Sequence, residues 1–230
     1  MNIFKTFETL IGGASPVAIS PRGDVAAVGD LKNITIWDVH TGTKHSKPLA
    51  ESARVLSLAF SHDSQRLVSG LNDGTLSIWD VASREPVISP LKVHICLISC
   101  LSFSHDGELV VSGSYDRTFG IWDASTGKQK YGPVPMGNTV LSIAISPGKD
   151  RVVCGLIDGA IKTYDLDTKY LGIKFFHHRG PVFSTLFSQD GTRIASAGYG
   201  QEVCLRVGKD YILRDVFNDT GTQAGESSTI

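Results

Sequence analysis

The chain has 230 residues, of which 41% are hydrophobic and 20% are charged, a composition typical of a folded globular protein rather than a disordered one. Its 22 basic and 23 acidic residues give a net charge of −1, so no overall field attracts nucleic acid or an anionic membrane, and we expect neither partner. The longest apolar runs are much shorter than the ~18 residues of a membrane helix.

The ends of the chain and the cysteines indicate the compartment. Residues 1–10 lack the apolar core of a signal peptide, and the four cysteines include no Cys-x-x-Cys pair and no dense disulfide pattern. Disulfides are rare in reducing compartments. We therefore expect a reduced, cytoplasmic protein, with the nucleus as the alternative.

A unit of about 42 residues recurs along the chain. Trp37-Asp38, Trp79-Asp80 and Trp122-Asp123 are separated by 42 and 43 residues, and Tyr164-Asp165 continues the series. A fifth copy has decayed to Arg206-Val207. Self-similarity at such a period predicts a stack of small structural units, each of which buries its apolar surface against its neighbours.

Each unit contains the same order of short strands and tight turns. The third unit begins with an apolar strand that ends in Ser-His-Asp-Gly107, and a second strand follows over 109–112. The turn Tyr115-Asp116-Arg117 leads into a third strand that closes on Trp122-Asp123, and a more variable fourth strand follows. Four antiparallel strands in about 40–45 residues form a propeller blade.

Taken together, these motifs resemble the WD-repeat β-propeller family over roughly residues 14–217. The residues around Trp122 also resemble repeats of fungal NTPase-linked receptor proteins. The resemblance implies an all-β propeller of about five four-stranded antiparallel blades in one domain, residues 1–217. Its repeats are expected at approximately 14–53, 54–97, 98–139, 140–181 and 182–217.

The family usually closes its ring with seven blades, and this chain has room for five. We therefore expect an incomplete or open ring, completed by another chain or by further blades, rather than a tight five-bladed ring. Residues 1–10 alternate well enough to be a closing outer strand, a place that residues 211–217 could also take. The small, polar residues 218–230 are expected to be disordered.

Blades of this family often contain a buried network of His, Ser, Asp and Trp. Spacing places all four in the third repeat, at His94, Ser112, Asp116 and Trp122. The first three also resemble a hydrolase triad, but no Gly-x-Ser-x-Gly elbow surrounds the serine. We therefore expect a structural network in the third blade, and no catalytic residue.

No other motif indicates chemistry. Cys96 and Cys100 near His94 and His105 do not have the spacing of a zinc site, and no phosphate-binding loop is present. We therefore expect no metal, no cofactor and no enzymatic activity.

Other proteins are the expected partners. In the family, the residues just before the turn aspartate surround the central channel on one face, and here they are Asn72, Tyr115, Ile157 and Tyr199. The tyrosines and the isoleucine could anchor a partner, or all four could be ordinary turn residues. The leading hypothesis is a non-enzymatic interaction scaffold. The alternatives are an enzyme that uses the central channel and an adaptor of chromatin or ubiquitin machinery.

Overall fold

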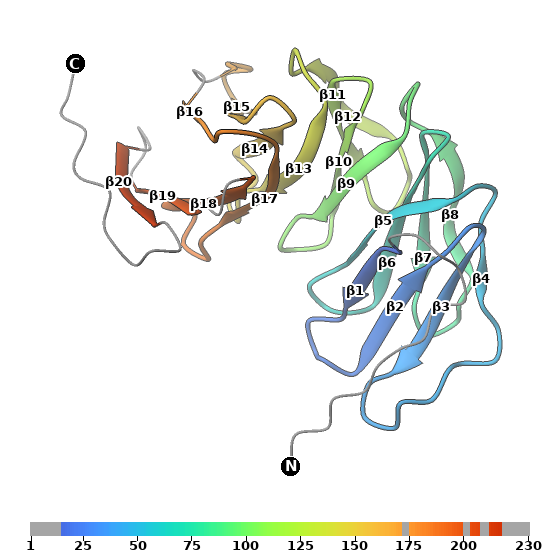
Figure 1. Ribbon diagram of the computed structural model, residues 1–230. Helices are drawn as coiled ribbons and strands as arrows, with labels where there is room; N and C mark the ends of the chain where they lie inside the picture. Colours follow the sequence, from blue (N-terminus) through green and yellow to red (C-terminus); the bar gives the residue numbers. More distant parts are fainter. Residues whose placement is uncertain (1–14, 172–174, 200–202, 208–211, 218–230) are drawn as a thin grey trace.

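The computed structural model describes residues 15–171, 175–199, 203–207 and 212–217 (Figure 1). The predicted closing strand over residues 1–10 and the predicted tail over residues 218–230 lie outside the described residues. In the described part no helix has the length and apolar character needed to span a membrane.

In these described residues, twenty strands form five antiparallel sheets of four, and in each sheet consecutive strands pair in chain order. The first sheet contains β1 (Val17–Ile19), β2 (Val25–Gly29), β3 (Asn33–Asp38) and β4 (Leu49–Ala50). The second contains β5 (Val55–Phe60), β6 (Arg66–Leu71), β7 (Thr75–Asp80) and β8 (Pro86–Lys92). The third contains β9 (Ile98–Phe103), β10 (Leu109–Ser114), β11 (Thr118–Asp123) and β12 (Gln129–Pro135). The fourth contains β13 (Val140–Ile145), β14 (Arg151–Leu156), β15 (Ala160–Asp165) and β16 (Phe175–His177). The fifth contains β17 (Val182–Phe187), β18 (Arg193–Gly198), β19 (Val203–Val207) and β20 (Ile212–Phe217).

The turn between the first two strands of a blade is closed by side chains as well as by backbone bonds. In the third blade, Ser104 donates its hydroxyl proton to Asp106 at 2.6 Å and accepts the amide of Leu109 at 2.9 Å. Gly107 takes a φ of 72°, a left-handed conformation that glycine adopts without steric cost. The repeated Ser-x-Asp-Gly motif thus turns the chain back at a fixed place in the repeat.

The hydrophobic core lies between blades rather than within them. Ile34 and Ile36 of the first blade pack in one buried cluster with Leu67 and Trp79 of the second. Trp122 of the third blade packs in the same way with Leu76 and other residues of the second. Because a single sheet cannot bury both of its faces, each blade depends on its neighbours for its core.

The five blades form an open propeller arc, with the first and fifth sheets at its two ends (Figure 1). The first strands of successive blades pack side by side, β1 with β5, β5 with β9, β9 with β13, and β13 with β17. The end sheets leave apolar side chains in solvent, among them Ile19 on β1, 62% exposed, and Leu186 on β17, 61% exposed. The expected all-β fold with an open ring is confirmed.

Most first strands are less buried than their apolar sequences suggest, with β13 as the exception. In β5 only Val55 and Ser57 are buried and the other four positions are half-buried, whereas β6 and β7 are almost entirely buried. The first strand of each blade is an edge strand of its sheet, which leaves one side of it without a strand partner in the same sheet.

Candidate partner-binding surface

The four predicted rim residues occupy the same place in four successive blades. Each begins the turn between the second and third strands. The backbone amide of each donates to the carbonyl oxygen of the residue immediately before the first strand of the same blade. These bonds are Asn72 to Arg54 at 2.9 Å, Tyr115 to Leu97 at 3.1 Å, Ile157 to Thr139 at 3.0 Å, and Tyr199 to Pro181 at 2.9 Å. They therefore lie on one face of the arc, at the end where the first strands begin.

Three of these residues expose large apolar surface. Tyr115 is 42% exposed, Ile157 is 37% exposed and Tyr199 is 66% exposed, while Asn72 adds an exposed amide. Ile95, in the loop before β9, is 90% exposed and belongs to the same face, because its backbone amide donates to Asp116 at 3.2 Å, beside Tyr115. We call Asn72, Ile95, Tyr115, Ile157 and Tyr199 the rim.

The third blade brings the four predicted network residues together. The indole N–H of Trp122 donates to the Ser112 hydroxyl at 2.8 Å, and that hydroxyl lies 2.8 Å from Nε2 of His94. The other imidazole nitrogen, Nδ1, lies 2.8 Å from Asp116. Because an indole can only donate, the serine proton is directed to Nε2 and His94 donates from Nδ1 to the carboxylate. With a neutral imidazole, each hydrogen-bond donor of this network therefore has an acceptor.

Burial lowers the pKa of His94 below its ordinary value, even though the adjacent Asp116 favours the charged ring. Burial alone would raise the pKa of Asp116, but hydrogen bonds from Thr118 and His94 outweigh it, and the pKa lies below its ordinary value. The electrostatics thus favour a neutral His94 and an ionised Asp116, which matches the proton arrangement.

The resemblance of this network to a hydrolase triad does not extend to its surroundings. Ser112 is fully buried, and its oxygen already accepts the Trp122 indole proton. A nucleophile needs an accessible oxygen and a nearby oxyanion site. This serine is placed to join β10 to β11 and to the loop before β9, where a substrate could not reach it.

The second blade replaces this network with a carboxylate. Glu51, which is 6% exposed, accepts the indole proton of Trp79 at 2.8 Å and the Ser77 hydroxyl at 3.0 Å, and Ser69 also donates to it. Burial raises the pKa of Glu51 although these three hydrogen bonds oppose the change. The turn residue Asp73 bonds the amide of Thr75 instead.

The remaining blades contain partial versions. In the fourth, the apolar side chains of Met136 and Cys154 are buried at two of the network positions. In the fifth, His178 lies 3.0 Å from the hydroxyl of Ser196, and both residues are buried. Among the described residues, no group of three or more His, Cys, Asp and Glu side chains is placed to hold a metal ion.

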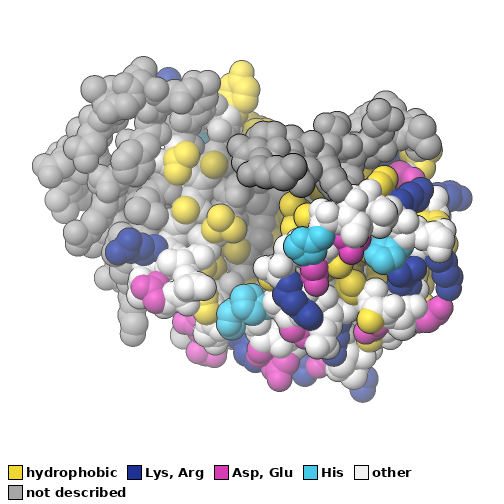
Figure 2. Space-filling view, turned by 90° about the horizontal axis from the view of Figure 1, so that it is seen from below, with side chains coloured by type: hydrophobic (Ala, Val, Ile, Leu, Met, Phe, Trp, Pro, Cys, Tyr) yellow, Lys and Arg dark blue, Asp and Glu magenta, His cyan; other side chains and the backbone are white. Residues whose placement is uncertain are grey.

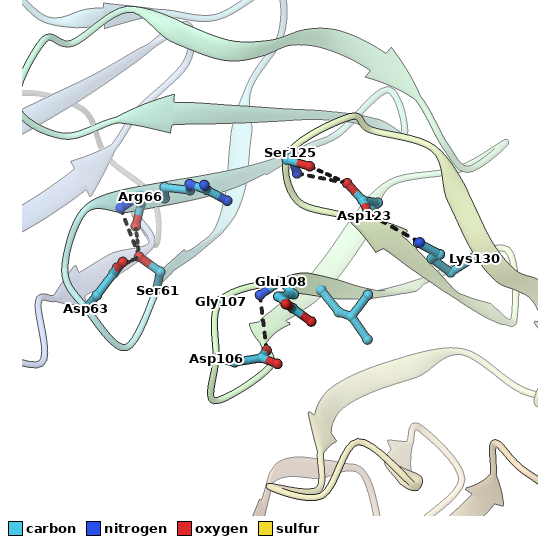
Figure 3. Close-up of a pocket in the computed structure, with 10 residues that line it drawn as sticks. Ser61, Asp63, Arg66, Asp106, Gly107, Glu108, Asp123, Ser125 and Lys130 are labelled. Carbon is cyan, nitrogen blue, oxygen red and sulfur yellow. Dashed lines mark hydrogen bonds and ion pairs between the residues drawn. The ribbon is translucent and has the colours of Figure 1, made fainter.

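A polar cavity of about 390 Å³ lies between the turns of the second and third blades (Figure 3). Several of its charged groups already have partners: Asp63 accepts from Ser61 at 2.6 Å, and Asp123 accepts from Ser125 at 2.7 Å and pairs with Lys130 at 3.3 Å. Hydrogen bonds from Ser125 and Thr126 lower the pKa of Asp123. These contacts stabilise the turns, and they do not converge on a common point where a reacting atom could sit.

Comparison with known proteins gives one family. The model of the WD domain, G-beta repeat, matches residues 40–80, 85–123 and 170–205, together about half of the chain. The Schizosaccharomyces pombe protein "Periodic tryptophan protein 2 homolog" is 30% identical over 96 residues, which are 39% of this chain and 11% of that protein. The Arabidopsis thaliana "WD repeat-containing protein VIP3" is 29% identical over 188 residues, 81% of this chain and 49% of that protein. "Autophagy-related protein 16" of Arabidopsis thaliana is 28% identical over 76% of this chain and 34% of that protein. The chain thus spans about half, or less, of the length of these curated relatives.

Proposed function

Because the chain belongs to the WD-repeat family, we propose that it is a non-enzymatic scaffold whose rim binds a protein partner. The observation that carries the proposal is the recurrence of large, exposed apolar side chains at one position of three successive blades, Tyr115, Ile157 and Tyr199. Relatives with WD repeats are in general proteins that assemble with other proteins, which supports the same class of function. We further propose that the protein acts in the cytoplasm.

The strongest part of this surface is the pair Ile95 and Tyr115. Both side chains are exposed, while the backbone beneath them is fixed by Asp116, which accepts the amide of Ile95 and is itself held by Thr118 and His94. Apolar anchors on a rigid base lose little conformational entropy on binding, which is why such residues dominate interface energetics. The buried network therefore serves the rim by positioning it.

Affinity purification with mass spectrometry tests the proposal, because the unknown is the partner. We compare the wild-type chain with the double variant Ile95→Ser, Tyr115→Ala. The control is Tyr170→Ala, which removes a 58%-exposed tyrosine near the turn after β15. We expect the rim variant to lose partners that the wild type and the control both retain.

Circular dichroism of all three proteins shows whether each has folded. Retention of every partner by a folded rim variant would overturn the assignment of the rim. Equal losses from the rim variant and from Tyr170→Ala would also contradict it, since a general surface effect would then explain the result.

A further inference from the structure

The face of the arc opposite to the rim contains a further hollow, formed where the first strands end. It measures about 440 Å³, and its walls come from all five blades: the last residues of β5, β9, β13 and β17, and the turns that begin at Pro21, His62, His105, Pro147 and Gln189. We call it the axial hollow. A six-residue strand is about 20 Å long, so the axial hollow and the rim are separate surfaces.

Small side chains at one repeated position leave this space open. Ala59, Ser102 and Ala144 pair with Val68, Val111 and Val153 on the adjacent second strands, and these pairs are equivalent in the three blades. The residues that follow them in the chain are large, Phe60, Phe103 and Ile145, and they line the hollow too. The small side chains leave room beside the large apolar ones in the lining.

Among the described residues, those that line the axial hollow include no Asp, Glu, Lys or Arg. The charged residues on the surrounding turns are bonded to one another or to the backbone: Lys149 pairs with Asp106 and Glu108, and Arg22 donates to the carbonyl of Asp63. A charged ligand would lose hydration there without gaining a partner. The electrostatics therefore favour an uncharged occupant.

Two histidines form part of the edge. His62 and His105 come from neighbouring blades, both are exposed, and their ring centroids are 4.1 Å apart at 43°. Their imidazole nitrogens can bond a carbonyl oxygen beside an apolar group. Figure 2, which shows the molecule from below, has hydrophobic side chains visible between the polar turns and histidine side chains near them.

We propose that the axial hollow binds an uncharged aromatic side chain of a protein partner. The volume lies within the range of about 300–1,000 Å³ that ligand sites occupy. Three phenylalanines, Phe60, Phe103 and Phe187, are among the lining residues, and aromatic rings pack favourably against one another. Because all five blades contribute, an occupied hollow also holds the arc in one curvature. The hollow is a second site beyond the rim, and a small probe tests it independently.

The probe is N-acetyl-L-tryptophanamide, added to protein with ¹³C-labelled alanine methyl groups. We expect saturable shifts of the Ala59 and Ala144 methyl signals with a dissociation constant in the millimolar range, and no saturable shift of Ala82, which lies in the exposed turn after β7 and outside the hollow. N-acetyl-L-tryptophan, which carries a carboxylate, should bind several-fold more weakly. Non-saturable shifts, shifts centred on Ala82, or equal binding of the charged analogue would each overturn the proposal.

Three variants locate the binding. Ser102→Phe fills the floor of the hollow and should abolish the saturable shifts, whereas Ser102→Ala keeps the space and should retain them. Gln65→Phe places the same new ring on a nearby exposed turn outside the hollow and should bind as the wild type does. Unchanged binding by Ser102→Phe would overturn the site. Tyr115→Ala should leave the titration unchanged, so failure at the rim and failure here remain distinguishable.

Discussion

The Ser112 hydroxyl is the centre of the buried network, because it accepts from Trp122 and donates to His94 at 2.8 Å each. Ser112→Ala leaves an indole donor and an imidazole acceptor buried without this partner, which costs about 1–3 kcal/mol. We expect that loss in the free energy of unfolding measured with urea. Ser52→Ala, at an exposed position before β5, is the matched control and should stay near the wild-type value. Equal stability of the two variants would show that the network contributes nothing.

Glu51 makes the second blade sensitive to pH in an unusual direction. Burial raises its pKa in the folded protein above the ordinary value of 4.5. A raised folded pKa means that its contribution to stability is complete below the unfolded pKa and is lost as the pH rises through the folded pKa. Glu51→Gln keeps an acceptor for Trp79 and Ser69 and removes the ionisation.

We therefore expect Glu51→Gln to be more stable than the wild type at pH 7 and similar to it near pH 4. Urea unfolding curves across that range measure the difference. A variant that is less stable at pH 7 would show that the ionised carboxylate is favourable where it lies.

The residues of the two networks differ in how far the sequence predicts them. Spacing alone identifies His94, Ser112, Asp116 and Trp122, because each occupies a fixed place in a repeat, and the structure brings them within hydrogen-bond distance. Spacing also puts Glu51 at the histidine position, but not its direct bond to Trp79, which depends on side-chain length and rotamer. The exposure of Ile95 cannot be predicted from the sequence either, since an isoleucine next to a strand is usually expected in the core.

At the scale of the turns, equivalent positions tolerate different residues. Gly74 and Arg117 immediately precede the third strands of their blades, β7 and β11, and have φ of 83° and 70°. A Cβ on Gly74 would lie 2.3 Å from the carbonyl oxygen of His94, which belongs to the loop that leads into the next blade. Arg117 already carries a Cβ at the same position in the third blade.

We expect Gly74→Ala to cost about 2–4 kcal/mol, because it adds both backbone strain and a contact with a backbone atom. Arg117→Gly should stay within about 1 kcal/mol of the wild type, since relief of strain and gain of chain entropy in the unfolded state oppose each other. Thermal unfolding of both variants checks the pair. Similar losses from the two would mean that the position itself, rather than the loop over Gly74, sets the requirement.

The blade as an element is more predictable than the space between blades. Strand order within a unit follows from alternating apolar runs and turn residues, so all four strands of a blade can be expected from its sequence. The axial hollow depends instead on the convergence of four first strands and the turn after β1, so that Ala59, Ser102 and Ala144 line one space. Residues about 42 positions apart acquire a shared environment only when the blades pack.

For the whole molecule, the open arc gives the inner sheet faces and the two end faces different surroundings. Between neighbouring blades, the apolar face of one sheet covers that of the next, as Ile34 and Ile36 pack with Leu67 and Trp79. At the first sheet, Val17 and Ile19 are 58% and 62% exposed, and their pairing register makes them equivalent to Leu58 and Phe60, which pack against that inner cluster. The start of the arc thus presents one half of an inter-blade interface.

The far end presents the other half. Val203 on β19, 44% exposed, is equivalent by register to Ile161, which is buried between the fourth and fifth blades. Two different, complementary faces on one chain produce a head-to-tail contact, which does not close on itself as a two-fold contact does. We therefore expect the isolated 230-residue chain to associate in a series whose mean mass rises with protein concentration.

Ile19→Glu should abolish this association, because a carboxylate at the centre of an apolar contact would lose its hydration without a partner. Leu31→Glu is the control, since Leu31 is also exposed, at 49%, but lies in a turn of the first blade rather than on its open face. Size-exclusion chromatography with light scattering measures the mass of each protein over a range of concentrations. A wild type that keeps the monomer mass throughout would contradict the complementarity of the two ends. Association that survives Ile19→Glu would place the contact elsewhere, because the open face of β1 would then no longer be available to an apolar partner.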